Sequence, residues 1–134
     1  MTSVDDKIAT FLAAPSFGVV GASSKREKYG NKVLRCYLQD GRNAIPVNPV
    51  ETEIEGRACV ASVNDLPKEA VSISIITPPR VTEQVVEQAI AKGIKNIWMQ
   101  PGAESQAAVT ACRQAGINVI ADGSCVLVVL GYNE

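Results

Sequence analysis

The stretch Phe17-Gly18-Val19-Val20-Gly21-Ala22-Ser23-Ser24 places a short apolar run directly before a loop of glycine and small polar residues. An apolar run that does not alternate with polar residues is typical of a strand buried on both faces. The loop extends to Gly30, and Asn31–Gln39 then carries apolar residues at helical spacing. We therefore predict a strand, a tight turn at Gly21 and a helix, which together form the first half of a β-α-β unit.

The same order recurs on both sides of this stretch. Glycines at positions 41, 93 and 116 each follow a helical pattern, where glycine commonly ends a helix. Ser3 and Thr77 are candidate caps at helix starts. Further helices are predicted over Val4–Ala13, Arg80–Lys92 and Glu104–Ala115, and strands over Ala44–Val47, Val71–Thr77, Ile97–Gln100 and Val119–Ala121, with a weak strand near Ala58–Ala61.

Short apolar strands separated by helices predict an α/β fold with a mainly parallel sheet and helices on both faces. We expect one Rossmann-like, doubly wound domain over residues 1–134, with strand order 3-2-1-4-5-6 and the weak strand third. Ligands of such folds bind beyond the carboxyl ends of the strands. This rule singles out the loops Gly21–Gly30, Asn48–Pro49, Thr77–Pro79 and Pro101–Ala103.

Charge and composition narrow the classes of partner. The formal net charge of −1 offers no global attraction for nucleic acid or anionic lipid, so we expect neither as a partner. Five cations and one acid between Lys25 and Arg35 nevertheless give this segment a local excess of four positive charges. A local anion site accounts for such a cluster better than a nucleic-acid surface does.

The chain has four cysteines without a C-x-x-C pair, and no histidine, so no metal-ligand spacing is present. Its polar, acidic start does not resemble a signal peptide, and no stretch predicts a transmembrane helix. We expect a cytoplasmic protein with reduced cysteines.

The first loop has the chemistry of a phosphate site. Gly21 allows the backbone to approach a ligand closely, Ser23 and Ser24 offer hydroxyls, and we expect free amides at the helix start near Gly30–Lys32. The alternative is a tight turn with a solvated, charged tip. Gly21→Val is expected to abolish ligand binding and to leave the fold intact.

The loop lacks the G-x-G-x-x-G pattern of dinucleotide-binding proteins. Asn48-Pro49 also stands where an acid would hold the ribose of NAD. Both features argue against NAD and NADP.

Several motifs in this order resemble the small stand-alone CoA-binding domain family, which is related to the CoA-binding domain of the succinyl-CoA synthetase α subunit. The similarity extends from about Phe17 to Asp122. Its motifs are Val19-Val20-Gly21-Ala22-Ser23, Lys28-Tyr29-Gly30-Asn31, Ile45-Pro46-Val47-Asn48-Pro49, Glu53-Ile54-Glu55-Gly56, Asp65-Leu66-Pro67, Thr77-Pro78-Pro79 and Ile97-Trp98-Met99-Gln100-Pro101-Gly102.

The resemblance implies coenzyme A as the ligand. In that family the first loop wraps the pyrophosphate, the segment after the second strand lies near the adenosine, and the segment after the fourth strand walls the cleft. Carried over position by position, the implied binding residues are Gly21, Ala22, Ser23, Ser24, Lys28, Val47, Asn48, Pro49, Thr77 and Pro78.

The resemblance weakens near the C-terminus. Family members often read Asp-Arg-Cys after the last strand, whereas this chain has Asp122-Gly123-Ser124-Cys125, so a family role for the cysteine does not transfer directly. A small buried thiol is the simpler interpretation. The following run Val126–Leu130 predicts an edge strand or a packed tail, with a homodimer contact as the second choice.

Two main functions follow from these observations. The first is a binding module that holds CoA or an acyl-CoA and has no catalytic centre of its own, since no nucleophile–base–orienter set is evident. The second is an enzyme or enzyme subunit that uses the bound thioester through Cys125 or Asp122. A third is a regulatory protein that binds NAD or an adenine nucleotide.

Overall fold

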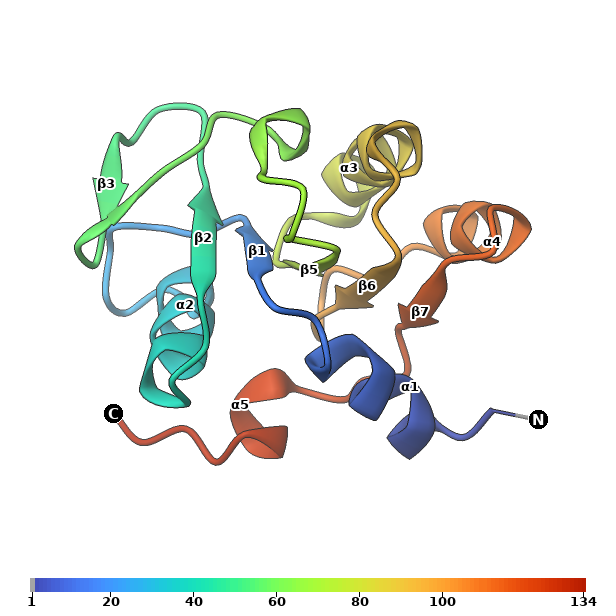
Figure 1. The fold of residues 1–134 in the computed structure, drawn as a ribbon, viewed down its shortest axis with the longest axis horizontal. Coiled ribbons are helices and arrows are strands. Elements are labelled where there is room, and N and C mark those ends of the chain that lie inside the picture. Colours follow the sequence, from blue (N-terminus) through green and yellow to red (C-terminus); the bar gives the residue numbers. More distant parts are fainter. Residues whose placement is uncertain (1) are drawn as a thin grey trace.

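A computed structural model describes residues 2–134 and shows five parallel strands side by side in the order β2-β1-β5-β6-β7 (Figure 1). The neighbouring strands pair in parallel throughout this sheet. The strands are β1 (Phe17–Val20), β2 (Ala44–Val47), β5 (Ser72–Ile75), β6 (Asn96–Met99) and β7 (Asn118–Ile120). The predicted parallel α/β fold is confirmed.

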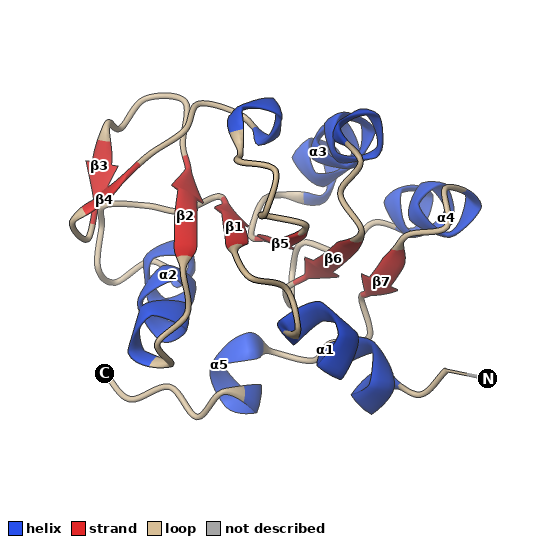
Figure 2. Ribbon diagram, in the orientation of Figure 1, coloured by secondary structure: helices blue, strands red, loops and turns tan. Residues whose placement is uncertain are grey.

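Helices cover both faces of the sheet, as the doubly wound prediction requires. In Figure 2, α1, α2 and α5 lie on one side of the strands, and α3 and α4 lie on the other. The helices are α1 (Val4–Leu12), α2 (Tyr29–Gln39), α3 (Pro79–Lys92), α4 (Gln106–Gln114) and α5 (Val126–Val129), with a short 3₁₀ helix, η1, at Val63–Asp65.

Alternating strand residues divide the core in two. Ile73 and Ile75 of β5 face the α3–α4 cluster, while Ser72 and Ser74 face the opposite layer. The serines are buried but paired. The Ser74 hydroxyl lies 2.5 Å from the Tyr37 hydroxyl, and the Ser72 hydroxyl donates to the Phe11 carbonyl at 2.8 Å. Polar residues therefore fit inside this strand because α1 and α2 supply their hydrogen-bond partners.

Local signals set most helix ends. Ser3 caps α1, since its hydroxyl accepts a hydrogen bond from the Asp6 amide at 3.1 Å. Gly93 ends α3 with a φ of +89°, in the left-handed region that glycine adopts without a penalty. Thr77 does not cap α3, because its hydroxyl instead pairs with the Thr82 hydroxyl at 2.8 Å. Pro78 occupies the N-cap position.

The prediction of a third sheet strand near Ala58–Ala61 is wrong, and so is the predicted order of six strands that included it. Residues 57–58 pair instead with Glu53–Ile54 in a small antiparallel ribbon, β4 with β3. Glu55 and Gly56 connect them with φ values of +51° and +76°, the backbone of a two-residue type I′ turn. Because these residues pair within the ribbon, they do not join the large sheet. Among the described residues, only Val60 of this segment forms an isolated parallel bridge, to Val47 of β2.

The C-terminal apolar run forms a helix, so the predicted edge strand is wrong, whereas the packed tail is confirmed. Val126 is fully buried in the core layer that contains α1 and α2. Val128 is 79% exposed and Val129 is 40% exposed. One side of this short helix therefore completes the core, while the other faces solvent.

Candidate functional site

Three of the four predicted loops meet at the carboxyl ends of β1, β2 and β5. They line a cavity of about 210 Å³, which is closed on one side by residues of α3 and η1. The Pro101–Ala103 loop does not line it. Six predicted residues form part of the wall, namely Gly21, Ala22, Val47, Asn48, Pro49 and Thr77, and the remaining lining residues are Val20, Ala61, Ser62, Val63, Val81, Val85 and Gln88.

Sequence reasoning missed the part of the wall that α3 and η1 contribute. Val81 and Val85 stand on a helical face that reads as core, and Ser62 lies in a segment without a motif. The two valines are one turn of α3 apart. They lie next to Thr77 because α3 begins at Pro79, directly after the Thr77–Pro78 segment. Most residues of the cavity wall are apolar. Such a wall suits an aromatic ring of a ligand better than its phosphate groups.

Four predicted residues lie outside this cavity wall. Ser24, Lys28 and Pro78 are exposed, and Ser23 is half-buried. The Ser23 hydroxyl accepts a hydrogen bond from the Lys25 amide at 3.1 Å, which shapes the turn of the loop. These four residues lie on the loops that lead to the cavity, but none of them lines it.

Gly21 has a structural role that the sequence did not reveal. Its φ is +97°, and a Cβ at this position would lie 2.2 Å from the Ile76 carbonyl oxygen. A Cβ on Gly30 would lie 2.0 Å from the Gly21 carbonyl oxygen. The backbone of the first loop at Gly21 therefore packs directly against the backbone of α2 at Gly30 and of Ile76 after β5, with no space for a side chain between them. The expectation that Gly21→Val leaves the fold intact is therefore wrong.

Backbone donors are available in the first loop, most of them at a different place from the predicted one. The amides of Asn31 and Lys32 both donate to the Lys28 carbonyl at 3.1 Å, so of the amides expected to be free near Gly30–Lys32 only that of Gly30 lacks an acceptor within residues 2–134. The amides of Ala22, Ser23 and Ser24 have no hydrogen-bond acceptor within residues 2–134. Three consecutive donors beside the cavity remain for a ligand or for water.

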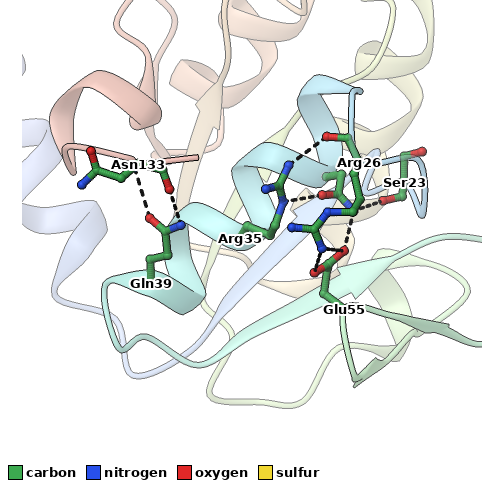
Figure 3. Close-up of polar contacts among 7 residues, drawn as sticks. Ser23, Arg26, Arg35, Gln39, Glu55 and Asn133 are labelled. Carbon is green, nitrogen blue, oxygen red and sulfur yellow. Dashed lines mark hydrogen bonds and ion pairs between the residues drawn. The ribbon is translucent and has the colours of Figure 1, made fainter.

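A polar network holds the first loop in place (Figure 3). Asn31 is fully buried, and its Nδ2 donates to the Ser23 carbonyl at 2.8 Å and to Glu55 Oε2 at 3.2 Å. Arg35 Nε donates to Asn31 Oδ1 at 2.6 Å, and its Nη2 donates to the Arg26 carbonyl at 2.8 Å. Arg26 Nη1 contacts both Glu55 oxygens, at 2.8 and 3.0 Å.

This network changes the charge argument for the loop. Glu55 neutralises Arg26, and Lys32 pairs with Glu134 at 3.0 Å. Arg35 is directed at a side-chain amide and a carbonyl oxygen of the protein itself. Lys25 and Lys28 are exposed and form no ion pair within the described residues. These two lysines carry the positive charge that a phosphate can use.

Asn48 joins the second loop to the first. Its Nδ2 donates to the Ala22 carbonyl at 3.0 Å, while its Oδ1 accepts hydrogen bonds from the Val50 and Glu51 amides at 2.8 and 2.9 Å. Asn48 stands where NAD-binding proteins have a ribose-binding acid, and its hydrogen bonds hold two loops of the cavity wall together.

Potential catalytic groups lie on the other side of the first loop. The Cys125 sulfur lies 2.8 Å from the Tyr29 hydroxyl, and no carboxylate hydrogen-bonds it within residues 2–134. Asp122 Oδ1 accepts a hydrogen bond from the Ser124 amide at 3.1 Å, and hydrogen bonding to Ser124 lowers the pKa of this carboxyl. A carboxylate stabilised in this way is a weak base, and it does not activate the thiol.

Two kinds of feature are absent from residues 2–134. No group of three or more cysteine, aspartate or glutamate side chains is placed to hold a metal ion. No helix there has both the length and the apolar character needed to cross a membrane.

Over 88 residues the chain is 28% identical to the alpha subunit of ADP-forming acetate–CoA ligase II from Pyrococcus furiosus, a match covering 65% of this chain and 19% of that protein. The chain therefore spans about a fifth of this curated relative.

Two solved structures match over most of their length. A conserved hypothetical protein from Pyrococcus furiosus is 40% identical with a TM-score of 0.81, over 85% of this chain and 97% of that one. A hypothetical protein from Pyrococcus horikoshii OT3 is 32% identical with a TM-score of 0.87, over 94% and 88% respectively. The model of the CoA binding domain matches residues 15–130, and this match shows that the chain belongs to the CoA-binding domain family.

Proposed function

We propose that residues 1–134 act as a single CoA-binding domain that holds CoA or an acyl-CoA at the first strand-to-helix turn. The observation that carries the proposal is the meeting of three loops around one mainly apolar cavity, with the unpaired amides of Ala22, Ser23 and Ser24 at its edge. An apolar cavity suits an adenine ring, while amide donors suit a pyrophosphate.

Eight of the ten predicted binding residues receive distinct roles under this proposal. The cavity residues Val47, Pro49 and Thr77 would contact the adenosine, and Asn48 would hold its loop in position. Ser23, Ser24 and Lys28 would meet the phosphates together with Lys25, which the motif comparison had not included. Pro78 would support the wall through its place at the start of α3.

The absence of a ribose-binding acid favours CoA over NAD. Asn48 stands in that place, and its side-chain oxygen already accepts two backbone amides. CoA carries a 3′-phosphate besides its pyrophosphate, so two unpaired lysines stabilise it more than they stabilise a ligand with fewer phosphate charges. We therefore propose CoA rather than NAD as the ligand.

Melting the protein with CoA, dephospho-CoA and NAD in parallel tests this choice. Ligand at about 100 times its Kd adds roughly 2.7 kcal/mol to stability, so CoA should raise Tm by several degrees. Loss of one charged phosphate contact costs roughly 1.5–3 kcal/mol, or about one to two decades in affinity. Dephospho-CoA and NAD should therefore bind more weakly.

The loop lysines provide the matched control for this experiment. The double variant Lys25→Ala with Lys28→Ala should lose most of the CoA shift, whereas Lys68→Ala, an exposed lysine away from the cavity, should retain it. Equal stabilisation by NAD and CoA would contradict the assignment of the pocket.

A second function is an enzyme subunit that uses the bound thioester. The specific observation in its favour is the similarity to an acetate–CoA ligase subunit, of which this chain matches a fifth. We propose that this chain supplies the binding step alone, because Cys125 and Asp122 do not hydrogen-bond to each other in the described residues. Thioester loss on mixing the purified protein with acetyl-CoA would favour the enzyme instead.

We also propose that the ligand-binding domain is cytoplasmic and forms a homodimer. The four cysteines are free thiols, which suits a reducing compartment. Val128, on the open side of α5, is 79% exposed, and Val129 beside it is 40% exposed. An apolar surface of this kind is more stable when a second copy covers it.

Light scattering of the wild-type protein and of Val128→Lys checks the dimer. We expect a dimer for the wild type and a monomer for the variant, because a lysine charge at the contact would lose its water. Since Val128 is exposed, the substitution should leave Tm of the folded monomer unchanged. A monomeric wild-type protein would overturn the homodimer.

A further inference from the structure

A cluster of three polar side chains lies beside the first loop but outside the cavity. Tyr29 begins α2, Gln100 follows β6, and Cys125 precedes α5. The Tyr29 hydroxyl lies 3.1 Å from Gln100 Oε1 and 2.8 Å from the Cys125 sulfur. Residues from three distant parts of the chain thus meet at the edge of the sheet where the loops of the proposed CoA site lie.

Gln100 brings an unused hydrogen-bond donor to this cluster. Its side chain is fully buried, and its Nε2 has no partner among the described residues. The orientation of the amide is determined by the Val126 backbone N–H, which donates to Oε1 at 3.0 Å and would face a second donor if the amide were flipped. A buried donor without an acceptor is unusual, and a bound group can supply that acceptor.

The hydrogen bonds also orient the thiol. Because the Tyr29 hydroxyl donates its one proton to Gln100 Oε1, the Cys125 thiol donates to the Tyr29 oxygen. Burial, followed by the contact with Cys125, raises the pKa of Tyr29. The phenol therefore stays neutral and can turn its proton toward the sulfur when the thiol loses its own.

The other three cysteines have less suitable surroundings. Cys36 and Cys112 are buried, and burial raises the pKa of each thiol to about 11. Burial and the charges of Glu51 and Glu53 raise the pKa of Cys59. Cys125 is half-buried, its sulfur contacts the Tyr29 hydroxyl, and the Cys36 thiol is near enough to interact with it electrostatically. Among the four cysteines of the described residues, Cys125 is the one whose sulfur contacts a side-chain hydroxyl.

The cluster is also next to the proposed phosphate loop. Tyr29 directly precedes Gly30, whose Cα packs so closely on the Gly21 carbonyl oxygen that no Cβ fits between them. The adenosine cavity lies on the α3 side of this contact, whereas Tyr29 and Cys125 lie on the α2 and α5 side. A ligand whose phosphates rest on the loop can therefore extend its other end toward Cys125.

We propose that Cys125 is a thiol–disulfide exchange site that forms a mixed disulfide with CoA, with Tyr29 as a positioning residue and Gln100 as a residue that binds the arm of the ligand. The inference rests on the proposed CoA binding. The Cys125 thiolate attacks one sulfur of CoA disulfide, a protein–CoA disulfide forms, and the disulfide of the reagent breaks. The released CoA thiolate takes the proton that Cys125 gave up. Gln100 Nε2 then has an acceptor in an amide carbonyl of the pantetheine arm.

The test is the rate of adduct formation on the intact, reduced protein. CoA disulfide and glutathione disulfide are supplied separately at equal concentration, and intact-mass spectrometry with peptide mapping follows the product. Binding through the nucleotide raises the local concentration of the reagent, so CoA disulfide should modify Cys125 roughly tenfold faster or more. Cys125→Ser should abolish the adduct, while Cys59→Ser, the matched control, should leave it unchanged.

The variant Tyr29→Phe tests whether the Tyr29 hydroxyl positions the thiol or whether the ring only fills space in the core. It removes the hydroxyl that stabilises the thiolate, so the pH profile of the exchange rate should move to higher pH. An unchanged profile would remove Tyr29 from the proposal. Adduct on Cys59, no adduct at all, or equal rates for both disulfides would each overturn the exchange site.

Failure of CoA binding has a different signature. Reduced CoA should still raise Tm of Cys125→Ser, because the nucleotide contacts remain. Loss of that shift in both wild type and variant would refute the proposed function, whereas a retained shift without preferential exchange would refute the exchange site alone.

Discussion

Replacing Gly21 by alanine should destabilise the protein by about 3–5 kcal/mol and lower Tm by roughly 10–20 °C. The new Cβ would lie 2.2 Å from the Ile76 carbonyl oxygen and 2.8 Å from its carbon, both of which are backbone atoms. Relief would require β1 and β5 to separate where the Ile76 amide donates to the Val20 carbonyl at 2.8 Å. The residue would also have to adopt a φ of +97°.

Gly93→Ala is the matched control for this prediction. Gly93 has a similar φ of +89°, but apart from its own helix and chain neighbours a Cβ there would meet no atom of residues 2–134 within 4 Å. It should therefore show the cost of the left-handed backbone alone, about 1–2 kcal/mol. Thermal and urea unfolding of both variants measures the difference. Equal losses of stability would mean that the contact with Ile76 does not restrict the site.

Asn31→Asp should destabilise the protein by about 2–4 kcal/mol and weaken CoA binding as well. The substitution preserves shape but replaces Nδ2, which donates both hydrogen bonds, by a single oxygen atom that faces the Ser23 carbonyl at 2.8 Å and Glu55 Oε2 at 3.2 Å. Contact with Arg35 compensates in part. Because the Ser23 segment carries the free amides, its displacement should reduce affinity for phosphate groups.

Two further variants make this second prediction specific. Asn64→Asp adds the same charge at an exposed position and should change the free energy of unfolding by less than about 0.5 kcal/mol. Adding Glu55→Gln to Asn31→Asp returns a donor that can face the new carboxylate, so stability should partly recover. Urea unfolding gives the stabilities, and calorimetric titration gives the CoA affinities. If Asn31→Asp behaves like Asn64→Asp, the network does not hold the loop.

Both predictions concern residues whose motif was visible in the sequence but whose contacts were not. Gly21 and Asn31 belong to segments that resemble the CoA-binding family. The sequence assigned Gly21 to close approach of a ligand, whereas the structure shows it against the protein's own backbone. Asn31 and Glu55 are 24 positions apart, and their pairing depends on the β3–β4 turn.

Local patterns alone were enough to determine the class of fold. Non-alternating strands such as Phe17–Val20, helical periodicity and glycine stops are properties of neighbouring residues, and they predicted the parallel sheet with helices on both faces. They also predicted four loops at the carboxyl edge of the sheet, three of which line the cavity, because parallel strands bring their carboxyl ends to one edge.

Tertiary structure decided the features that depend on competition between distant partners. Residues 57–58 pair with a near neighbour across the Glu55–Gly56 turn rather than with β2, since a short loop costs less entropy to close. The run from Val126 forms a helix because α1 and α2 leave an apolar surface for it to cover. Tyr29 meets Gln100 and Cys125 across 71 and 96 positions, and no local pattern records a contact that only the packed sheet creates.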